Sequence, residues 1–252
     1  MTKSSIALLV IVGAFTSACT ANSEDASSSS DESALSTCAS EGKIQGTNAS
    51  STGDPHMTSG DGLLFEDQLS GWHVEAKSDS AIVRGGWDLP LEVQISAAQY
   101  WCPAPYSTAH CTHAIDAYVA GNRVHFFKSG VVTVGGSPVA LAPSTSMPLA
   151  NRVTLAREAD APSPVYVITN GLGETFKMVI GTGMTIDLYV AFSPLRSNDR
   201  IGGILGCFDA DTDPSNDLCA RNKCQLSFPV SRVNAFIDEW QVLAGDAADT
   251  SE

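Results

Sequence analysis

Two stretches far apart in the chain carry the side chains best suited to chemistry. The first is the tetrad Gly53-Asp54-Pro55-His56, which is followed by a turn at Asp61-Gly62. The second is a short acidic segment whose oxygen-bearing side chains are Asp209, Asp211, Asp213, Asn216 and Asp217. Carboxylate and amide oxygens on a flexible loop suit Ca²⁺, and without a cation such crowded carboxylates repel one another. The segment therefore predicts a calcium site, with a solvated acidic loop as the alternative.

The spacing of this acidic segment excludes one familiar kind of calcium loop. An EF-hand requires a glutamate at its last position, and the residue there, counted from Asp209, is Ala220. Any calcium site must therefore draw its ligands in another arrangement.

The peptide bond between Asp54 and Pro55 is chemically weak. The carboxyl group of Asp54 can attack its own main-chain carbonyl carbon while the tertiary amide nitrogen of Pro55 leaves, and His56 is close enough in the chain to transfer protons. Strain in a tight turn assists such a step. The tetrad predicts either self-cleavage at this bond or a rigid proline turn that only positions Asp61.

The cysteines of the chain favour disulfides. It has 7 cysteines, and those left when Cys19 is set aside are Cys38, Cys102, Cys111, Cys207, Cys219 and Cys224. An even number in an exported protein predicts bridges. Cys102 and Cys111 bracket a proline-rich loop, and their short spacing favours a bridge between them. Cys219 and Cys224 are also close, which leaves Cys38 to pair with Cys207.

A zinc site is the alternative use of the first pair. His110 and His113 flank Cys111, with Cys102 upstream, and imidazole and thiolate groups are zinc ligands. Exported cysteines are usually oxidised, and no Cys-x-x-Cys pair accompanies these residues. The disulfide is therefore the favoured interpretation.

The first residues predict export. Lys3 is the only charge before the apolar run from Ile6 to Phe15, and small residues lead into Cys19. The run is too short to span a bilayer. We interpret residues 1–18 as a signal peptide and Cys19 as a lipidated N-terminus at a bacterial cell envelope or surface. The alternative is an ordinary secretory signal cleaved near Ala18.

Composition limits the partners and the domain organisation. Residues 19–52 are rich in serine and acidic side chains, which predicts a solvated tether ahead of one domain. The formal net charge of −14 disfavours nucleic acid and bare anionic membranes, so the only expected membrane contact is through a lipid on Cys19. Divalent cations are the natural counterions.

Short apolar runs that alternate with polar residues dominate the domain, and Gly and Asn turns separate them. The predicted strands are 72–76, 91–95, 115–119, 123–127, 131–134, 153–155, 165–168, 176–180 and 185–190. This spacing predicts an all-β fold, an antiparallel β-sandwich stapled by disulfides, because parallel strands need helical crossovers. A short helix over Val233 to Leu243 has an apolar face that closes the sandwich, and residues 244–252 form a disordered tail.

From Gly53 to about Leu243 the chain resembles the von Willebrand factor type D domain. The resemblance rests on the tetrad Gly53-Asp54-Pro55-His56 at one end and on Gly203-Ile204-Leu205-Gly206-Cys207-Phe208-Asp209 with Asn216-Asp217 at the other. Between these ends only the order of strands and turns matches. The chain departs from the family pattern at Leu205, which stands where the family has cysteine, and at Cys207, which stands where it has asparagine.

The resemblance implies a particular calcium site and a particular class of function. Asp61 would join Asp209, Asp211 or Asp213, Asn216 and Asp217 around one ion. The family also links its leading cysteine region to this neighbourhood, as a Cys38 to Cys207 bridge would. Family members bind and assemble, and in some, such as gel-forming mucins, the bond matching Asp54-Pro55 is cut without a protease, leaving an anhydride that can couple to other molecules.

We therefore expect a calcium-stabilised module at the cell surface that binds a protein or glycan, and not a turnover enzyme. No Gly-x-Ser-x-Gly, His-Glu-x-x-His or phosphate-loop motif is present in the sequence. The first alternative is a self-processing module in which Asp54, Pro55 and His56 act at their own bond and cross-link to a neighbour. A carbohydrate-active sandwich and a structural envelope protein are the others. Tyr100 and Trp101 are candidates for partner contact or for core packing.

Overall fold

The structure is a computed structural model, and it describes most of the domain. The described residues are 48–53, 55–60, 64–67, 69–78, 91–104, 109–159, 162–181, 185–196 and 201–205. The predicted signal peptide, most of the tether, the helix over 233–243 and the tail lie outside them. Among the described residues, no helix is long and apolar enough to cross a membrane.

The described chain forms two antiparallel sheets. The eight-stranded sheet has the order β10-β11-β12-β13-β14-β1-β2-β3, and the seven-stranded sheet has the order β15-β4-β5-β6-β7-β8-β9. The strands of the first are β1 Ala49–Thr52, β2 His56–Thr58, β3 Leu64–Glu66, β10 Thr145–Pro148, β11 Thr154–Arg157, β12 Val165–Thr169, β13 Thr175–Ile180 and β14 Ile186–Ala191. The strands of the second are β4 Gly71–Ser78, β5 Val93–Trp101, β6 His110–Val119, β7 Asn122–Phe127, β8 Val132–Val134, β9 Ser137–Val139 and β15 Ile201–Gly202. A 3-10 turn, Ala150–Arg152, precedes β11.

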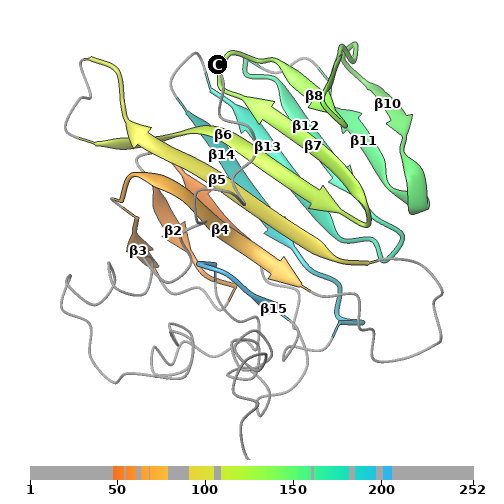
Figure 1. Cartoon of the computed structure of the whole chain (residues 1–252), viewed down its shortest axis with the longest axis horizontal. Coiled ribbons are helices and arrows are strands. Elements are labelled where there is room, and N and C mark those ends of the chain that lie inside the picture. The colour runs from red at the N-terminus through yellow and green to blue at the C-terminus, as the bar shows by residue number, and fades with distance from the viewer. Residues whose placement is uncertain are drawn as a thin grey trace, which may run out of the picture.

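The two sheets pack face to face as a sandwich. In Figure 1, strands β4 to β7 lie in front of β12 to β14. The core between the sheets is made of alternating side chains, such as Ile95, Ile115 and Phe126 from one sheet and Phe176 and Leu188 from the other, and all of these are buried. The predicted all-β, antiparallel sandwich is therefore confirmed.

Each of the runs predicted as strands lies on an observed strand or directly beside one, because alternation of β-branched and aromatic residues suits a half-buried surface.

β1 was missed, and it corrects the boundary placed at residue 53. Ala49–Thr52 falls in the segment predicted as tether, yet it pairs with β14 on one side and β2 on the other. The run Ala-Ser-Ser-Thr carries no strong apolar alternation, so only its two neighbours make it a strand.

A late segment of the chain lies directly beside β4. β15 pairs with the end of β4 at Ser78 and Lys77, and Figure 1 shows the blue β15 next to the orange β4. Gly203 then passes so close that an added Cβ would lie 2.6 Å from the carbonyl oxygen of Glu75. Its φ of +114° also favours glycine. No other residue fits this position without moving the β4 backbone.

A buried ion pair ties the two sheets together at one end. Arg196 and Glu174 have fully buried side chains, and the guanidinium donates from Nε and Nη2 to the two carboxylate oxygens at 2.5 and 2.7 Å. Arg196 also donates to Ser78 Oγ at 2.8 Å and to the Leu91 carbonyl oxygen at 2.6 Å. Glu174 precedes β13 in one sheet, whereas Ser78 and Leu91 belong to the β4 and β5 ends of the other.

Breaking this pair should destabilise the fold strongly. Glu174→Gln leaves the guanidinium of Arg196 buried without its counter-charge, and we expect a loss of about 3–5 kcal/mol in the free energy of unfolding. The measurement is urea denaturation.

Glu158→Gln is the matched control. Glu158 pairs with Lys177 at 3.2 Å, but the two side chains are 47% and 39% exposed. An exposed pair of this kind contributes at most about 1 kcal/mol. Equal losses of unfolding free energy in Glu174→Gln and Glu158→Gln would contradict a larger contribution from the buried pair.

Candidate functional site

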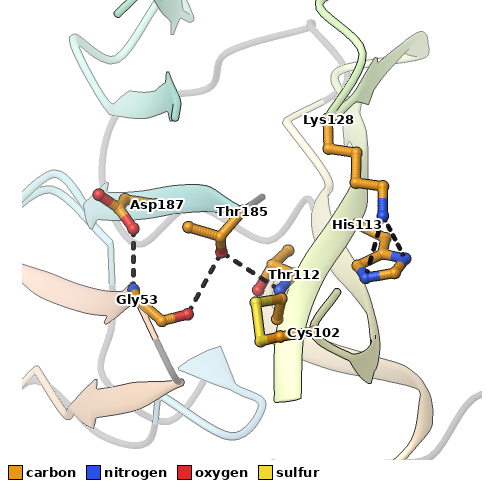
Figure 2. Close-up of a disulfide and its surroundings, with 8 residues drawn as sticks. Gly53, Cys102, Thr112, His113, Lys128, Thr185 and Asp187 are labelled. Atoms are coloured by element: carbon orange, nitrogen blue, oxygen red, sulfur yellow. Dashed lines mark hydrogen bonds between the residues drawn. A yellow bond between two sulfur atoms is a disulfide. The ribbon is translucent and has the colours of Figure 1, made fainter. Parts of the chain in front are cut away.

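The tetrad begins in a tight turn between β1 and β2. Thr52 pairs with His56, so the chain reverses direction between these two residues. Gly53 has a φ of +66°, a left-handed conformation that glycine adopts at no steric cost. Its amide donates to Asp187 Oδ1 at 2.8 Å, and its carbonyl oxygen accepts from Thr185 Oγ1 at 3.3 Å, as Figure 2 shows. Both main-chain polar groups of Gly53 are therefore hydrogen-bonded to side chains.

The other side of the weak bond is held as well. The carbonyl oxygen of Pro55 accepts a hydrogen bond from the Asp67 amide at 3.1 Å. His56 Nδ1 lies 3.3 Å from Glu66 Oε1, and both of these side chains are more than half exposed. Asp54 itself lies outside the described residues. The structure therefore fixes the residues on both sides of Asp54 and leaves His56 open to water.

Asp67, whose amide contacts Pro55, belongs to a buried polar cluster. Asp67, His73, Glu75 and Gln99 are all fully buried. Gln99 donates to Glu75 Oε1 at 3.1 Å. His73 Nδ1 lies 3.0 Å from Asp67 Oδ2, an ion-pair distance, although the angle does not make a hydrogen bond. Glu75 occupies a register shift in β4 between Val74 and Ala76, and such a bulge turns a side chain away from its usual face.

This cluster holds a carboxyl group with a raised pKa. Burial raises the pKa of Glu75 well above its usual value, the negative charge of Asp67 adds to the rise, and the hydrogen bond from Gln99 opposes it. No spacing or motif in the sequence distinguishes these residues. His73, Glu75 and Gln99 stand among apolar neighbours on β4 and β5, and Asp67 directly follows β3.

The disulfide predicted between Cys102 and Cys111 is present. The two Cα atoms are 5.1 Å apart, and the bridge joins the end of β5 to the start of β6. Because both thiols are used in this bond, the zinc alternative loses its two cysteine ligands. His110 instead contacts Ser70 Oγ at 2.8 Å, and His113 lies beside the ammonium group of Lys128.

Exposed aromatic side chains gather beside this disulfide. Trp101 is 59% exposed and Tyr100 is 40% exposed, so neither packs in the core. The Trp101 ring lies 4.2 Å from that of His110, and the Tyr100 ring lies 5.7 Å from that of His113, measured between centroids. Because consecutive strand residues point to opposite faces, the end of the β5–β6 hairpin exposes one aromatic ring beside a histidine on each face.

The two approaches to the predicted calcium site meet in the structure. The amide of Gly60, which directly precedes Asp61, donates to the carbonyl oxygen of Leu205 at 3.0 Å. The expected ligands Asp61, Asp209, Asp211, Asp213, Asn216 and Asp217 lie outside the described residues, as do Cys19, Cys38, Cys207, Cys219 and Cys224. Within the described part of the chain, no three His, Cys, Asp or Glu side chains are placed to hold a metal ion.

Comparison with models of known protein families and with curated protein sequences finds no match. The interpretation of the site therefore rests on its residues and geometry.

Glu75 predicts a pH dependence of stability. The unfolded chain loses the Glu75 proton near the ordinary pKa, whereas the folded chain keeps it to higher pH. The contribution of Glu75 is therefore fully present below about pH 4 and is lost as the pH rises through the raised folded pKa. Glu75→Gln keeps the acceptor oxygen and removes the titratable group. The free energy of unfolding of this variant should therefore increase relative to that of the parent protein as the pH rises.

Urea denaturation at a series of pH values measures this difference. The series runs from about pH 4, near the ordinary pKa of glutamate, to about pH 8. Glu158→Gln, at an exposed glutamate, should show no such trend. Parallel pH profiles for Glu75→Gln and the parent would contradict a raised pKa for the buried Glu75 carboxyl group.

Proposed function

We propose that this protein is a calcium-stabilised extracellular binding module, and that the ion joins the turn after Gly60 to the acidic segment after Leu205. The observation that carries the proposal is the hydrogen bond between the Gly60 amide and the Leu205 carbonyl oxygen. These residues are far apart in the sequence but lie directly before the two groups of expected ligands.

The path of the late segment explains how this contact arises. After β15, the amides of Ile204 and Leu205 donate to the carbonyl oxygens of Val74 and Glu75, both at 2.9 Å. The segment is thus fixed along β4 until it reaches Gly60. Asp61 is the next residue after Gly60, and Asp209 follows Leu205 within a chain length of at most about 14 Å. Chain geometry therefore permits both groups of carboxylates to reach one ion.

The chemistry of the expected ligands fits calcium. They are carboxylates and one amide, which are hard oxygen donors, and the formal net charge of the chain is −14. Bound calcium would neutralise part of this repulsion and connect the start of the domain with its end. Its role in the proposal is to stabilise the fold.

The exposed aromatic end of the β5–β6 hairpin is the best-supported contact surface. Tyr100 and Trp101 each offer flat apolar area with a polar tip, a combination enriched at binding interfaces, and they do so on opposite faces of the hairpin. The bridge between Cys102 and Cys111 fixes the backbone beneath them. A protein or glycan at the cell surface is the expected partner, and with the export signal this favours an adhesion or assembly role.

Removing a calcium ligand should cost stability only when the ion is present. A ligand at about a hundred times its Kd stabilises a folded protein by about 2.7 kcal/mol. For a domain of this size, we expect calcium to raise the Tm of the parent by about 5–10 °C. Asp61→Ala and Asp217→Ala should lose most of this rise and melt like the parent in chelator.

Glu158→Ala is the control for a general loss of negative charge, and it should keep the full calcium response. Melting curves for the parent that are identical in calcium and in chelator would remove the proposal.

A second function, self-processing at Asp54-Pro55, is favoured by the held turn. The Asp187 and Thr185 side chains hold Gly53, and the Asp67 amide holds the Pro55 carbonyl oxygen. A bond restrained on both sides loses little entropy on reaching a reactive geometry. His56 is exposed beside the bond and can exchange protons with water.

The step balances without an oxidant or a cofactor. A carboxyl oxygen of Asp54 forms a bond to its own main-chain carbonyl carbon, the bond from that carbon to Pro55 nitrogen breaks, and the carboxyl proton moves to the departing nitrogen. The products are a cyclic anhydride on Asp54 and a free secondary amine on Pro55. Water then opens the anhydride to two carboxyl groups, or a neighbouring amine opens it to an amide.

Cleavage would not release the N-terminal piece, because β1 lies on that piece. β1 pairs with both β14 and β2, and Ala49 and Ser51 are buried. The segment ending at Asp54 would therefore remain an internal strand of the eight-stranded sheet. A lipid on Cys19 would still anchor the domain after the bond is cut.

At mildly acidic pH we expect the parent to split at Asp54-Pro55, so that denaturing mass spectrometry finds two pieces while gel filtration finds one particle. A Cys38→Ser background removes the predicted bridge to Cys207, so retention then depends on β1 alone. Asp54→Ala should stay whole. An intact parent after long incubation would contradict self-processing, and separation of the pieces would contradict retention by β1.

A further inference from the structure

We propose that an open pocket on the outer face of the eight-stranded sheet binds a neutral sugar ring, with the aromatic ring of Tyr189 as its platform. The pocket has a volume of about 380 Å³, and small-molecule sites in proteins occupy about 300–1,000 Å³. This role rests on the proposed binding function and adds to it a contact site apart from the β5–β6 hairpin. The residues that line the pocket include Asn48, Thr175, Lys177, Val179, Tyr189 and Ala191.

Strand alternation places this pocket on the side of β13 and β14 that faces away from the core. Phe176 and Leu188 are buried between the two sheets, so Lys177 and Tyr189, their neighbours along the strands, point outward. Lys177 and Tyr189 are also directly opposite each other in the register of the two strands. Because β13 and β14 belong to the rear sheet in Figure 1, this outer face points away from the viewer.

A change from large to small side chains makes the hollow. Ala191 lies two residues from Tyr189 on the same face of β14, and it is opposite Thr175 of β13. These small side chains leave space beside Tyr189, which is 36% exposed. Asn48, which directly precedes β1, lines the same space. The tyrosine ring therefore stands at the side of an open hollow.

The pocket lies on strands that are internal to the sheet. β13 pairs with β12 and β14, and β14 pairs with β13 and β1. The main-chain groups of both strands are therefore used within the sheet, and a peptide cannot add to it here as a further strand. Recognition at this place must come from side chains.

The side chains that line the pocket match the groups of a sugar ring. Such a ring has an apolar C–H face and a rim of hydroxyl groups, which both donate and accept hydrogen bonds. Tyr189 offers flat apolar area to the C–H face. The Asn48 amide and the Thr175 hydroxyl group can donate and accept, and the Lys177 ammonium group donates. A few polar groups around an apolar contact are typical of small-molecule sites.

The charges at the pocket favour a neutral sugar. Lys177 Nζ lies 3.2 Å from Glu158 Oε2, so the positive charge of the lysine is already balanced. An acidic sugar would compete with Glu158 for the ammonium group and would be repelled by the formal net charge of −14. The ammonium group has three donors, so it can keep Glu158 and also bond a hydroxyl group of a neutral sugar.

The test displays the exported protein in many copies on fluorescent particles and measures their binding to an array of neutral and acidic oligosaccharides. The neutral oligosaccharide that binds best is then titrated into the dissolved protein, and NMR chemical shifts give the Kd. The variants are Tyr189→Ala, Tyr189→Phe and Lys177→Met. Tyr118→Ala is the matched control, because Tyr118 is 39% exposed on the outer face of the other sheet.

Tyr189→Ala should weaken binding about tenfold because the stacking area is lost. Lys177→Met should weaken it about fivefold because one hydrogen bond is lost. Tyr189→Phe keeps the ring and Tyr118→Ala leaves the pocket unchanged, so both should bind like the parent. Melting curves check that each variant is folded, and if Tyr189→Ala does not fold, Lys177→Met decides the result.

The proposal would be overturned if no neutral oligosaccharide bound, if acidic ones bound better, or if Tyr189→Ala bound as tightly as the parent. Loss of binding in Trp101→Ala but not in Tyr189→Ala would assign the sugar to the β5–β6 hairpin, and the binding function would then stand without this pocket. The calcium response of the melting curves is measured without sugar, so failure of the calcium site and failure of the sugar pocket are distinguishable.

Discussion

The close passage of Gly203 along β4 is the constraint on which the rest of the molecule depends. An added Cβ at Gly203 would lie 2.6 Å from the Glu75 carbonyl oxygen, so the late segment fits only with glycine there. This passage allows the Leu205 amide to donate a hydrogen bond to the Glu75 carbonyl oxygen, and the Leu205 carbonyl oxygen to accept one from the Gly60 amide. It brings together two parts of the sequence that are otherwise separated by most of the domain, and the proposed calcium site depends on that meeting.

Hydrogen bonds and an ion pair connect the two sheets near both ends of β14. The apolar core lies between these two sets of contacts. At one end, Thr185 connects Thr112 with Gly53. Beyond the other end, Arg196 connects Glu174 with Ser78 and Leu91. Because hydrogen bonds and ion pairs are directional, they fix how the sheets are placed, whereas apolar packing alone tolerates sliding.

The sequence was sufficient for the fold class because its strands are long and alternate clearly, as in Thr175–Ile180 and Ile186–Ala191. It was insufficient for Ala49–Thr52, whose small polar residues resemble a linker until β14 and β2 flank them. The Cys102–Cys111 bridge followed from short spacing. The buried His73 and Glu75 could not be predicted, because the apolar residues around them suggest that they face solvent, and a bulge at Glu75 alters that alternation.

A calorimetric titration of calcium into the protein from Cys38 to Leu243 tests the central claim most directly. The proposed joining of the Gly60 turn to the segment after Leu205 predicts heat of binding that saturates at one calcium ion per chain, and the loss of that heat in Asp61→Ala. No heat of binding at millimolar calcium, or full binding by the variant, would contradict a single ion held between these two parts of the chain.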